Sequence, residues 1–168
     1  GVIAALEAAL DTAEDSGVQR IVLLPRCEGM SFTDFEPDGA PDIHGFHKWE
    51  KLVTRLERAR ALTVAIADGP CHGPGFQLLL ACDVRVATGE ARFSLPEVQQ
   101  GYLPGMSTWR LARYVGLGRA KRIVLSGEVL DAEAAHALGL IDACAEALPL
   151  LLANSDDKYQ NEVMRLAP

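Results

Sequence analysis

Two short apolar runs, at residues 21–24 and 63–67, constrain the fold of this chain more than any other feature. Runs of this length are typical of strands that are buried on both faces of a parallel sheet. Further strands are expected at 84–87 and 91–93, and residues 2–14 and 44–58 repeat apolar side chains at helical spacing. This alternation of strands and helices predicts an α/β domain whose parallel strands are joined by helical crossovers.

The helical segments show which side chains should enter the core. The expected buried face of the first helix consists of Ile3, Leu6, Leu10 and Ala13, and that of the second of Phe46, Trp49, Leu52, Val53 and Leu56. Further helices are expected at 76–82, 107–115, 119–125 and 132–138, the last three each closed by a glycine. We therefore divide the chain into an α/β core, residues 1–142, and a helical C-terminal segment, residues 143–168, which we expect to be incomplete.

Composition limits the classes of function. The 168 residues are 49% hydrophobic and 23% charged, which suits one globular domain and excludes a predominantly disordered chain. A net charge of −7 argues against a general nucleic-acid binder, which needs a basic face. We expect no membrane span, because no apolar run reaches 18 residues. The four scattered cysteines predict free thiols in the cytoplasm. His44 and His47 have no clear partner ligands, so no metal site is expected.

A glycine-rich turn at residues 68–75 joins the strand 63–67 to an apolar helix. The N-terminus of a helix exposes unpaired N–H groups that suit an anion or a developing oxyanion. The spacing of Gly69, Gly73 and Gly75 matches neither a dinucleotide-binding fingerprint nor a P-loop. The turn therefore predicts either a binding site for a negatively charged oxygen or a tight structural turn.

The second segment with possible chemistry contains Glu97, within the stretch FSLPEV at 93–98. A carboxylate among apolar side chains is desolvated, which raises its pKa towards the range useful for general acid/base catalysis. The alternative is structural, because a carboxylate near the start of a helix is stabilised by the helix dipole. The pattern alone leaves both interpretations open.

Together these segments resemble the crotonase superfamily, the enoyl-CoA hydratase/isomerase family. The resemblance extends from residue 62 to residue 142 and includes TVAIADGPCHGPGFQLLLACDVRVA at 63–87 and the specific string PEVQQGYLPG at 96–105. It implies a crotonase-like α/β fold, the ββα spiral shared with ClpP, and binding of acyl-CoA thioesters.

The resemblance also implies roles for individual residues. The family holds the thioester carbonyl between two backbone N–H groups, which align here with Thr33 and Pro74. Its two proton-transferring glutamates align with Gln77 and Glu97. Pro74 has no N–H, so we expect the next residue, Gly75, to donate in its place. The remaining substrate-binding residues implied are Asp34, His72, Gly73, Tyr102 and Gly105.

The function implied is proton transfer on an enoyl-CoA of fatty acid metabolism, with Glu97 as the single acid/base. The reaction would be double-bond isomerisation, hydration or dehydration. No cofactor is expected beyond the coenzyme A of the substrate, and the family resemblance implies a homotrimer or hexamer. Two alternatives stay open. One is a specialised biosynthetic enzyme that dehydrates or decarboxylates a polyketide-like CoA intermediate; the other is a crotonase-fold protein that binds an acyl-CoA or a partner without turnover.

Overall fold

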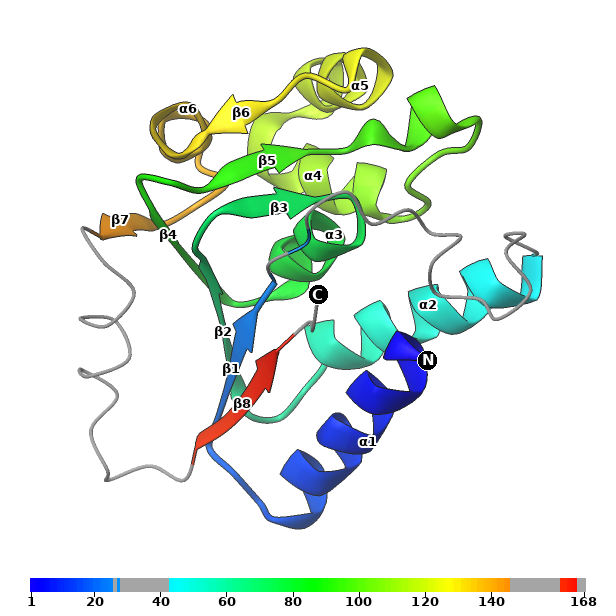
Figure 1. Ribbon diagram of the computed structural model, residues 1–168, viewed down its shortest axis with the longest axis vertical. Coiled ribbons are helices and arrows are strands. Elements are labelled where there is room, and N and C mark those ends of the chain that lie inside the picture. Colours follow the sequence, from blue (N-terminus) through cyan, green and yellow to red (C-terminus); the bar gives the residue numbers. More distant parts are fainter. Residues whose placement is uncertain (26, 28–42, 146–160, 166–168) are drawn as a thin grey trace.

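The structure is a computed structural model, and it describes residues 1–25, 27, 43–145 and 161–165. Figure 1 shows the course of the chain. The described elements are α1 (Val2–Asp15), β1 (Arg20–Leu24), α2 (Ile43–Glu57), β2 (Leu62–Ala67), β3 (Pro70–His72), α3 (Pro74–Ala81), β4 (Val84–Thr88), β5 (Arg92–Ser94), the 3-10 helix η2 (Pro96–Gln100), α4 (Ser107–Val115), α5 (Leu117–Ser126), β6 (Leu130–Asp131), α6 (Ala132–Ala137), β7 (Ala143–Ala145) and β8 (Asn161–Arg165).

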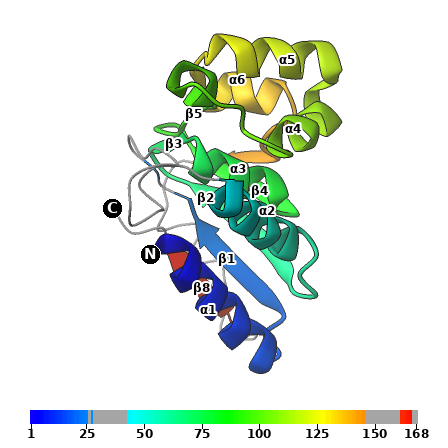
Figure 2. The ribbon, with the colours of Figure 1, turned by 90° about the vertical axis from the view of Figure 1, so that its right-hand side faces the viewer.

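The larger sheet is parallel throughout, with the strand order β7-β4-β2-β1-β8. Val22 of β1 pairs with Val64 of β2, which pairs in turn with Val84 of β4. Helices α1 and α2 lie side by side next to this sheet in both views (Figures 1 and 2). The α/β class is confirmed, and so are the strands predicted at 21–24, 63–67 and 84–87.

A smaller sheet, in the order β3-β5-β6, positions the two segments that we singled out. β3 and β5 are parallel, with Cys71 opposite Phe93 and His72 opposite Ser94. Because the two strands end at the same edge, the glycine turn after β3 and the segment after β5 leave the sheet as neighbours. Helices α4, α5 and α6 gather at this end of the molecule (Figure 2). The sequence did not predict β3, because Gly69 and Pro70 are typical of a turn.

The predicted core faces are confirmed apart from one residue. The buried residues of α1 are the four predicted, and α2 buries Trp49, Leu52, Val53 and Leu56, while Phe46 is only half-buried. Every residue of α3 is buried. Because α3 is enclosed on all sides, its polar side chain, Gln77, lies in the interior, where a polar group needs hydrogen-bond partners.

The helical C-terminal segment predicted at 143–168 is wrong for the residues that the structure describes. These residues form β7, which extends the sheet beside β4, and β8, which pairs with β1. Edge strands offer unpaired N–H and C=O groups, and adding a strand satisfies them. The division of the chain at residue 142 stays a prediction.

The four cysteines are free thiols, as predicted, with Cys27, Cys71 and Cys82 buried and Cys144 exposed. Burial raises the pKa of the Cys82 thiol to about 12. Within the described residues, no helix has the length and apolar character needed to cross a membrane. Nor do those residues include a cluster of three or more side chains that could hold a metal ion.

Candidate active site

Glu97 is the second residue of η2, and Pro96 occupies the first turn of that helix. Its position at the start of a helix agrees with the structural interpretation, but its burial goes further, because only 1% of the residue is exposed. Burial raises the pKa of the Glu97 carboxyl above its usual range, while hydrogen bonds from Gln77 and from its own backbone amide partly offset the effect. This is the desolvated carboxylate that the acid/base interpretation requires.

Gln77, on α3, is the direct partner of this carboxylate. Its Nε2 donates to Glu97 Oε1 over 2.7 Å, and both side chains are buried. The other carboxylate oxygen, Oε2, is also buried and has no hydrogen-bond partner among the described residues. An unpaired buried oxygen is costly to a fold, so it is a candidate for contact with a ligand.

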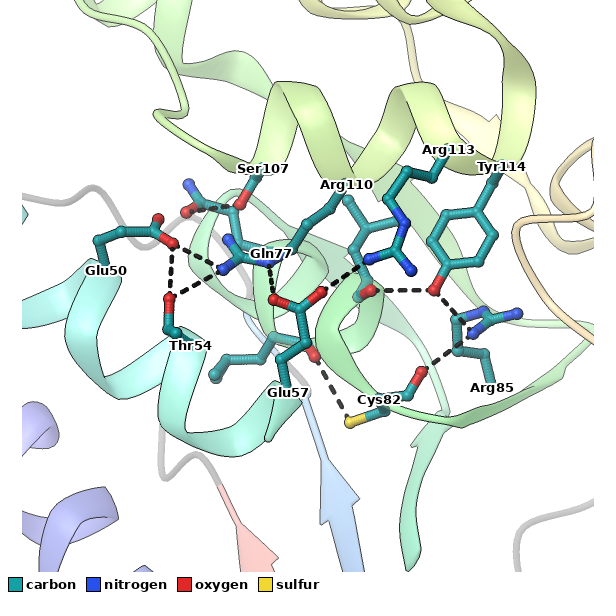
Figure 3. Close-up of polar contacts among 12 residues, drawn as sticks. Glu50, Thr54, Glu57, Gln77, Cys82, Arg85, Ser107, Arg110, Arg113 and Tyr114 are labelled. Carbon is teal, nitrogen blue, oxygen red and sulfur yellow. Dashed lines mark hydrogen bonds and ion pairs between the residues drawn. The ribbon is translucent and has the colours of Figure 1, made fainter. Parts of the chain in front are cut away.

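Two further donors converge on Gln77 from neighbouring helices. Trp49 Nε1 on α2 donates to Gln77 Oε1 over 2.8 Å, and Ser107 Oγ at the start of α4 donates to the same oxygen over 3.2 Å. Figure 3 shows the contact between Ser107 and Gln77. Helical spacing predicted Trp49 on the buried face of its helix and Ser107 only as the start of a helix, so neither was predicted to contact Gln77.

The glycine turn forms the N-terminus of α3. Gly73 caps the helix with a φ of 49°, and its N–H donates to the carbonyl oxygen of Ser94 over 2.9 Å. Pro74 occupies the first turn and has no N–H. In the described part of the chain, no acceptor pairs with the Gly75 N–H. The turn therefore keeps an unpaired donor at Gly75, and the donation from Gly75 to a substrate stays a prediction.

Close packing requires a glycine at position 75. A Cβ there would lie 2.7 Å from both Cys27 Cβ and the Pro25 carbonyl oxygen. His72, just before the turn, has its Nδ1 2.8 Å from Ser94 Oγ.

An apolar pocket of about 260 Å³ reaches Gln77. Tyr102 and Gly105, both implied by the family resemblance, line it, and the Tyr102 ring lies 5.4 Å from that of Phe46. The other lining residues are Ile43, Phe46, His47, Trp49, Glu50, Leu103, Pro104 and Met106. The predicted residues Gln77, Tyr102 and Gly105 thus share one pocket, and Glu97 contacts it through Gln77. Thr33 and Asp34 lie outside the described residues.

An ion-pair network around the buried Arg110 supports the wall of this pocket. Arg110 on α4 contacts Glu50 over 2.6 Å and Glu57 over 3.1 Å, both on α2 (Figure 3). Burial alone would lower the pKa of Arg110, but the two carboxylates outweigh it and raise that pKa. This network was not predicted, because helical spacing does not reveal which charge of one helix meets which charge of another.

The parallel α/β sheet, the glycine turn at a helix start and the buried glutamate beside an apolar pocket agree with the crotonase class that the sequence resembles. Comparison with known proteins assigns the family: the enoyl-CoA hydratase/isomerase family model matches residues 2–151. The chain belongs to the enoyl-CoA hydratase/isomerase family.

Individual relatives agree. An enoyl-CoA hydratase of Amycolatopsis orientalis is 40% identical over 99 residues, 59% of this chain and 46% of the relative. A short-chain enoyl-CoA hydratase of Clostridium acetobutylicum is 34% identical over 119 residues, 70% of this chain and 45% of the relative. The chain thus spans about half the length of these curated relatives.

Solved structures confirm the crotonase fold. A crystal structure of an enoyl-CoA hydratase from Mycobacterium smegmatis matches with a TM-score of 0.78 and 28% identity, covering 90% of this chain and 63% of that one. A family member from Silicibacter pomeroyi matches with a TM-score of 0.77 and 31% identity, covering 90% of this chain and 68% of that one.

Proposed function

We propose that this chain carries the acid/base part of an acyl-CoA active site, in which Glu97 is the single carboxylate that moves protons. One observation carries the proposal: Glu97 is buried beside the apolar pocket, with Oε1 held by Gln77 and Oε2 unpaired in the described residues. A raised pKa brings the carboxyl closer to neutral pH, where general acid/base catalysis is most efficient.

The chemistry that suits a single carboxylate is movement of a double bond. Glu97 Oε2 would take a proton from the carbon next to the thioester carbonyl. The electron pair of that C–H bond would form a double bond to the carbonyl carbon, and the π pair of the carbonyl would move onto its oxygen to give an enolate. Returning the proton two carbons further along a 3-enoyl thioester gives the 2-enoyl product. The reaction needs no outside oxidant or reductant. Addition or removal of water is the second reaction that this site could serve.

The enolate oxygen needs hydrogen-bond donors. We propose the Gly75 N–H as one of them, because it has no acceptor in the described residues and lies at the positive end of the α3 dipole. The backbone of Thr33 is the second proposed donor, on the strength of the family resemblance alone. His72, Gly73 and Asp34 stay predictions for substrate binding.

The substrate class follows from the pocket and the relatives. The pocket lining includes Ile43, Phe46, Leu103 and Met106, which suits an apolar acyl chain. Among the relatives, a 47% identical protein of Vibrio campbellii is named as the alpha subunit of a fatty acid oxidation complex; the match covers 61% of this chain and 15% of that protein. We therefore place the substrate among the fatty acyl-CoA thioesters.

A second candidate function is binding of an acyl-CoA without turnover. Pro74 favours it, because the position that aligns with a family donor has no N–H and the Gly73 N–H is already bonded to Ser94. Losing one donor to an oxyanion costs about 3–4 kcal/mol of transition-state stabilisation.

Retention on a CoA resin, followed by assays with crotonyl-CoA and a 3-enoyl-CoA, distinguishes the two candidates. We expect turnover, and we expect Glu97→Gln to lower kcat by roughly 10² or more while binding is nearly unchanged. Retention without turnover would support the binding role. Unchanged turnover in Glu97→Gln would refute the role of Glu97.

We also propose a homotrimer or hexamer in the cytoplasm. Exposed apolar side chains such as Trp109, Leu117 and Leu125 support self-association, and the free cysteines suit a reducing compartment. Light scattering at micromolar concentration tests the assembly, and a monomer would count against it.

A further inference from the structure

The orientation of the Gln77 amide follows from its neighbours. An indole N–H can only donate a hydrogen bond, so the atom of Gln77 that faces Trp49 Nε1 at 2.8 Å is the carbonyl oxygen. Ser107 Oγ donates to that same oxygen over 3.2 Å. The amide NH2 must then face Glu97 Oε1, at 2.7 Å. Trp49 thereby determines which group of Gln77 meets the carboxylate.

This orientation limits what Gln77 can do. A carbonyl oxygen has two lone pairs, and Trp49 and Ser107 occupy both. Gln77 therefore has no acceptor left for the proton of a water molecule. Of the four polar side-chain atoms of Gln77 and Glu97, only Glu97 Oε2 remains without a partner in the described residues.

We propose that Trp49 and Ser107 are positioning residues, which hold the Gln77 amide so that it bonds to Glu97 Oε1 and leaves Glu97 Oε2 as the unpaired oxygen that takes the proton. The proposal rests on the function proposed above and deepens it. It assigns the site to proton transfer to and from carbon, and it rules out activation of a water by residue 77.

The Glu97 pKa is a suitable measure of the orientation of the Gln77 amide. Its pKa responds to burial, to Gln77 and to its own backbone, with no charged side chain among the causes. The charged groups of the adjoining elements are ion-paired, hydrogen-bonded or exposed. Arg110 of α4 pairs with Glu50 and Glu57 of α2, Arg55 of α2 pairs with Asp11 and Glu14 of α1, and His72 of β3 contacts Ser94. The remaining ones are exposed: His44, His47, Lys48, Lys51, Arg92, Arg113, Arg119, Lys121 and Arg122.

A double-mutant cycle on the ligand-free protein tests whether Trp49 fixes the orientation of the Gln77 amide. The probe is the Glu97 carboxyl carbon, followed by NMR across pH and assigned with Glu97→Gln. Trp49→Phe keeps an aromatic ring, although a smaller one, and removes the N–H donor, which allows the amide to turn its oxygen towards Glu97. We expect a higher Glu97 pKa than in the wild type. In a Gln77→Met background, where no amide connects the two residues, Trp49→Phe should leave that pKa unchanged.

Trp109→Phe is the matched control, because Trp109 is a half-exposed residue on α4. Ser107→Ala is a second, smaller perturbation of the same oxygen, and it should also raise the Glu97 pKa. A Glu97 pKa that does not move in Trp49→Phe or in Ser107→Ala would overturn the proposal. So would an equal shift in the wild-type and Gln77→Met backgrounds, because Trp49 would then act through packing.

The activity readout separates this inference from the proposed function. With a 3-enoyl-CoA we expect Trp49→Phe to lower kcat about tenfold, the equivalent of one hydrogen bond, with little change in KM. A wild-type protein without turnover would refute the proposed function and leave the titration cycle intact. If the protein is catalytically active but the Trp49→Phe and Gln77→Met substitutions show no coupling in the Glu97 pKa, only the positioning role of Trp49 would be refuted.

Discussion

Replacing Gly75 with alanine tests how closely α3 packs against the end of β1. The new Cβ would lie 2.7 Å from Cys27 Cβ and from the Pro25 carbonyl oxygen, so one side must give by about 0.7 Å to reach ordinary contact at 3.4 Å. The oxygen belongs to the backbone just after β1, which the sheet holds in place. Overpacking of this kind costs about 1–3 kcal/mol. We expect a loss of about 2 kcal/mol, which lowers Tm by roughly 4–8 °C for a chain of this size.

Gly118→Ala is the matched control. Gly118 is the second residue of α5, and a Cβ there would meet nothing within 4 Å. We expect it to be neutral or to stabilise the protein by up to about 1 kcal/mol, because alanine favours the helix. Thermal and urea unfolding followed by circular dichroism measure both variants. If Gly75→Ala were as stable as Gly118→Ala, the close seating of α3 on the end of β1 would be refuted.

Three further predictions concern the ion pairs, the acid/base group and the turn. Arg110→Met leaves Glu50 and Glu57 without their buried partner, so it should lower the free energy of unfolding, measured with urea, by roughly 2–4 kcal/mol. Arg113→Met breaks the exposed pair with Glu57 and should lower the same free energy by less than about 1 kcal/mol. Because the Glu97 pKa is raised, the folded state binds its proton more tightly than the unfolded state, so this group lowers stability as pH rises from 4.5 through its folded pKa. Glu97→Gln should therefore be more stable than the wild type at pH 8 and equal to it below that window, and a constant difference across pH would contradict the shift. Pro74→Gly should change turnover little if Gly75 is the working donor, whereas a hundredfold rise would show that the native turn lacks one.

The sequence predicted the elements whose patterns are local. The prediction of β1 and β2 needs no long-range information, because a strand that is buried on both faces consists of consecutive apolar residues. The four buried positions of α1 follow from the helical period in the same way. For β7 and β8 local pattern failed, since pairing with β4 and β1 determines their structure.

The site residues likewise fall into those that the sequence could predict and those that depend on packing between helices. The family resemblance identified Gln77 and Glu97, which are twenty residues apart and prove to be hydrogen-bonded. It did not identify Trp49, which reaches Gln77 across 28 residues of sequence. The period of α2 showed that Trp49 faces inward, but a period cannot tell a packed indole from one whose N–H has an acceptor. That distinction depends on how α2 and α3 are rotated against each other.

The two departures from the family pattern lie on the first turn of α3, and they act on the two halves of the proposed reaction. Pro74 removes a donor from the thioester side, and the Gly73 N–H is bound to Ser94, so Gly75 is left to stabilise the enolate there. Gln77 removes a base from the proton-transfer side, and its bonds to Trp49 and Ser107 leave its oxygen unable to accept the proton of a water. Hydration needs an activated water as well as an acid, whereas isomerisation needs only a carboxylate that takes a proton and returns it. The turn as built therefore favours the reaction that Glu97 can perform alone.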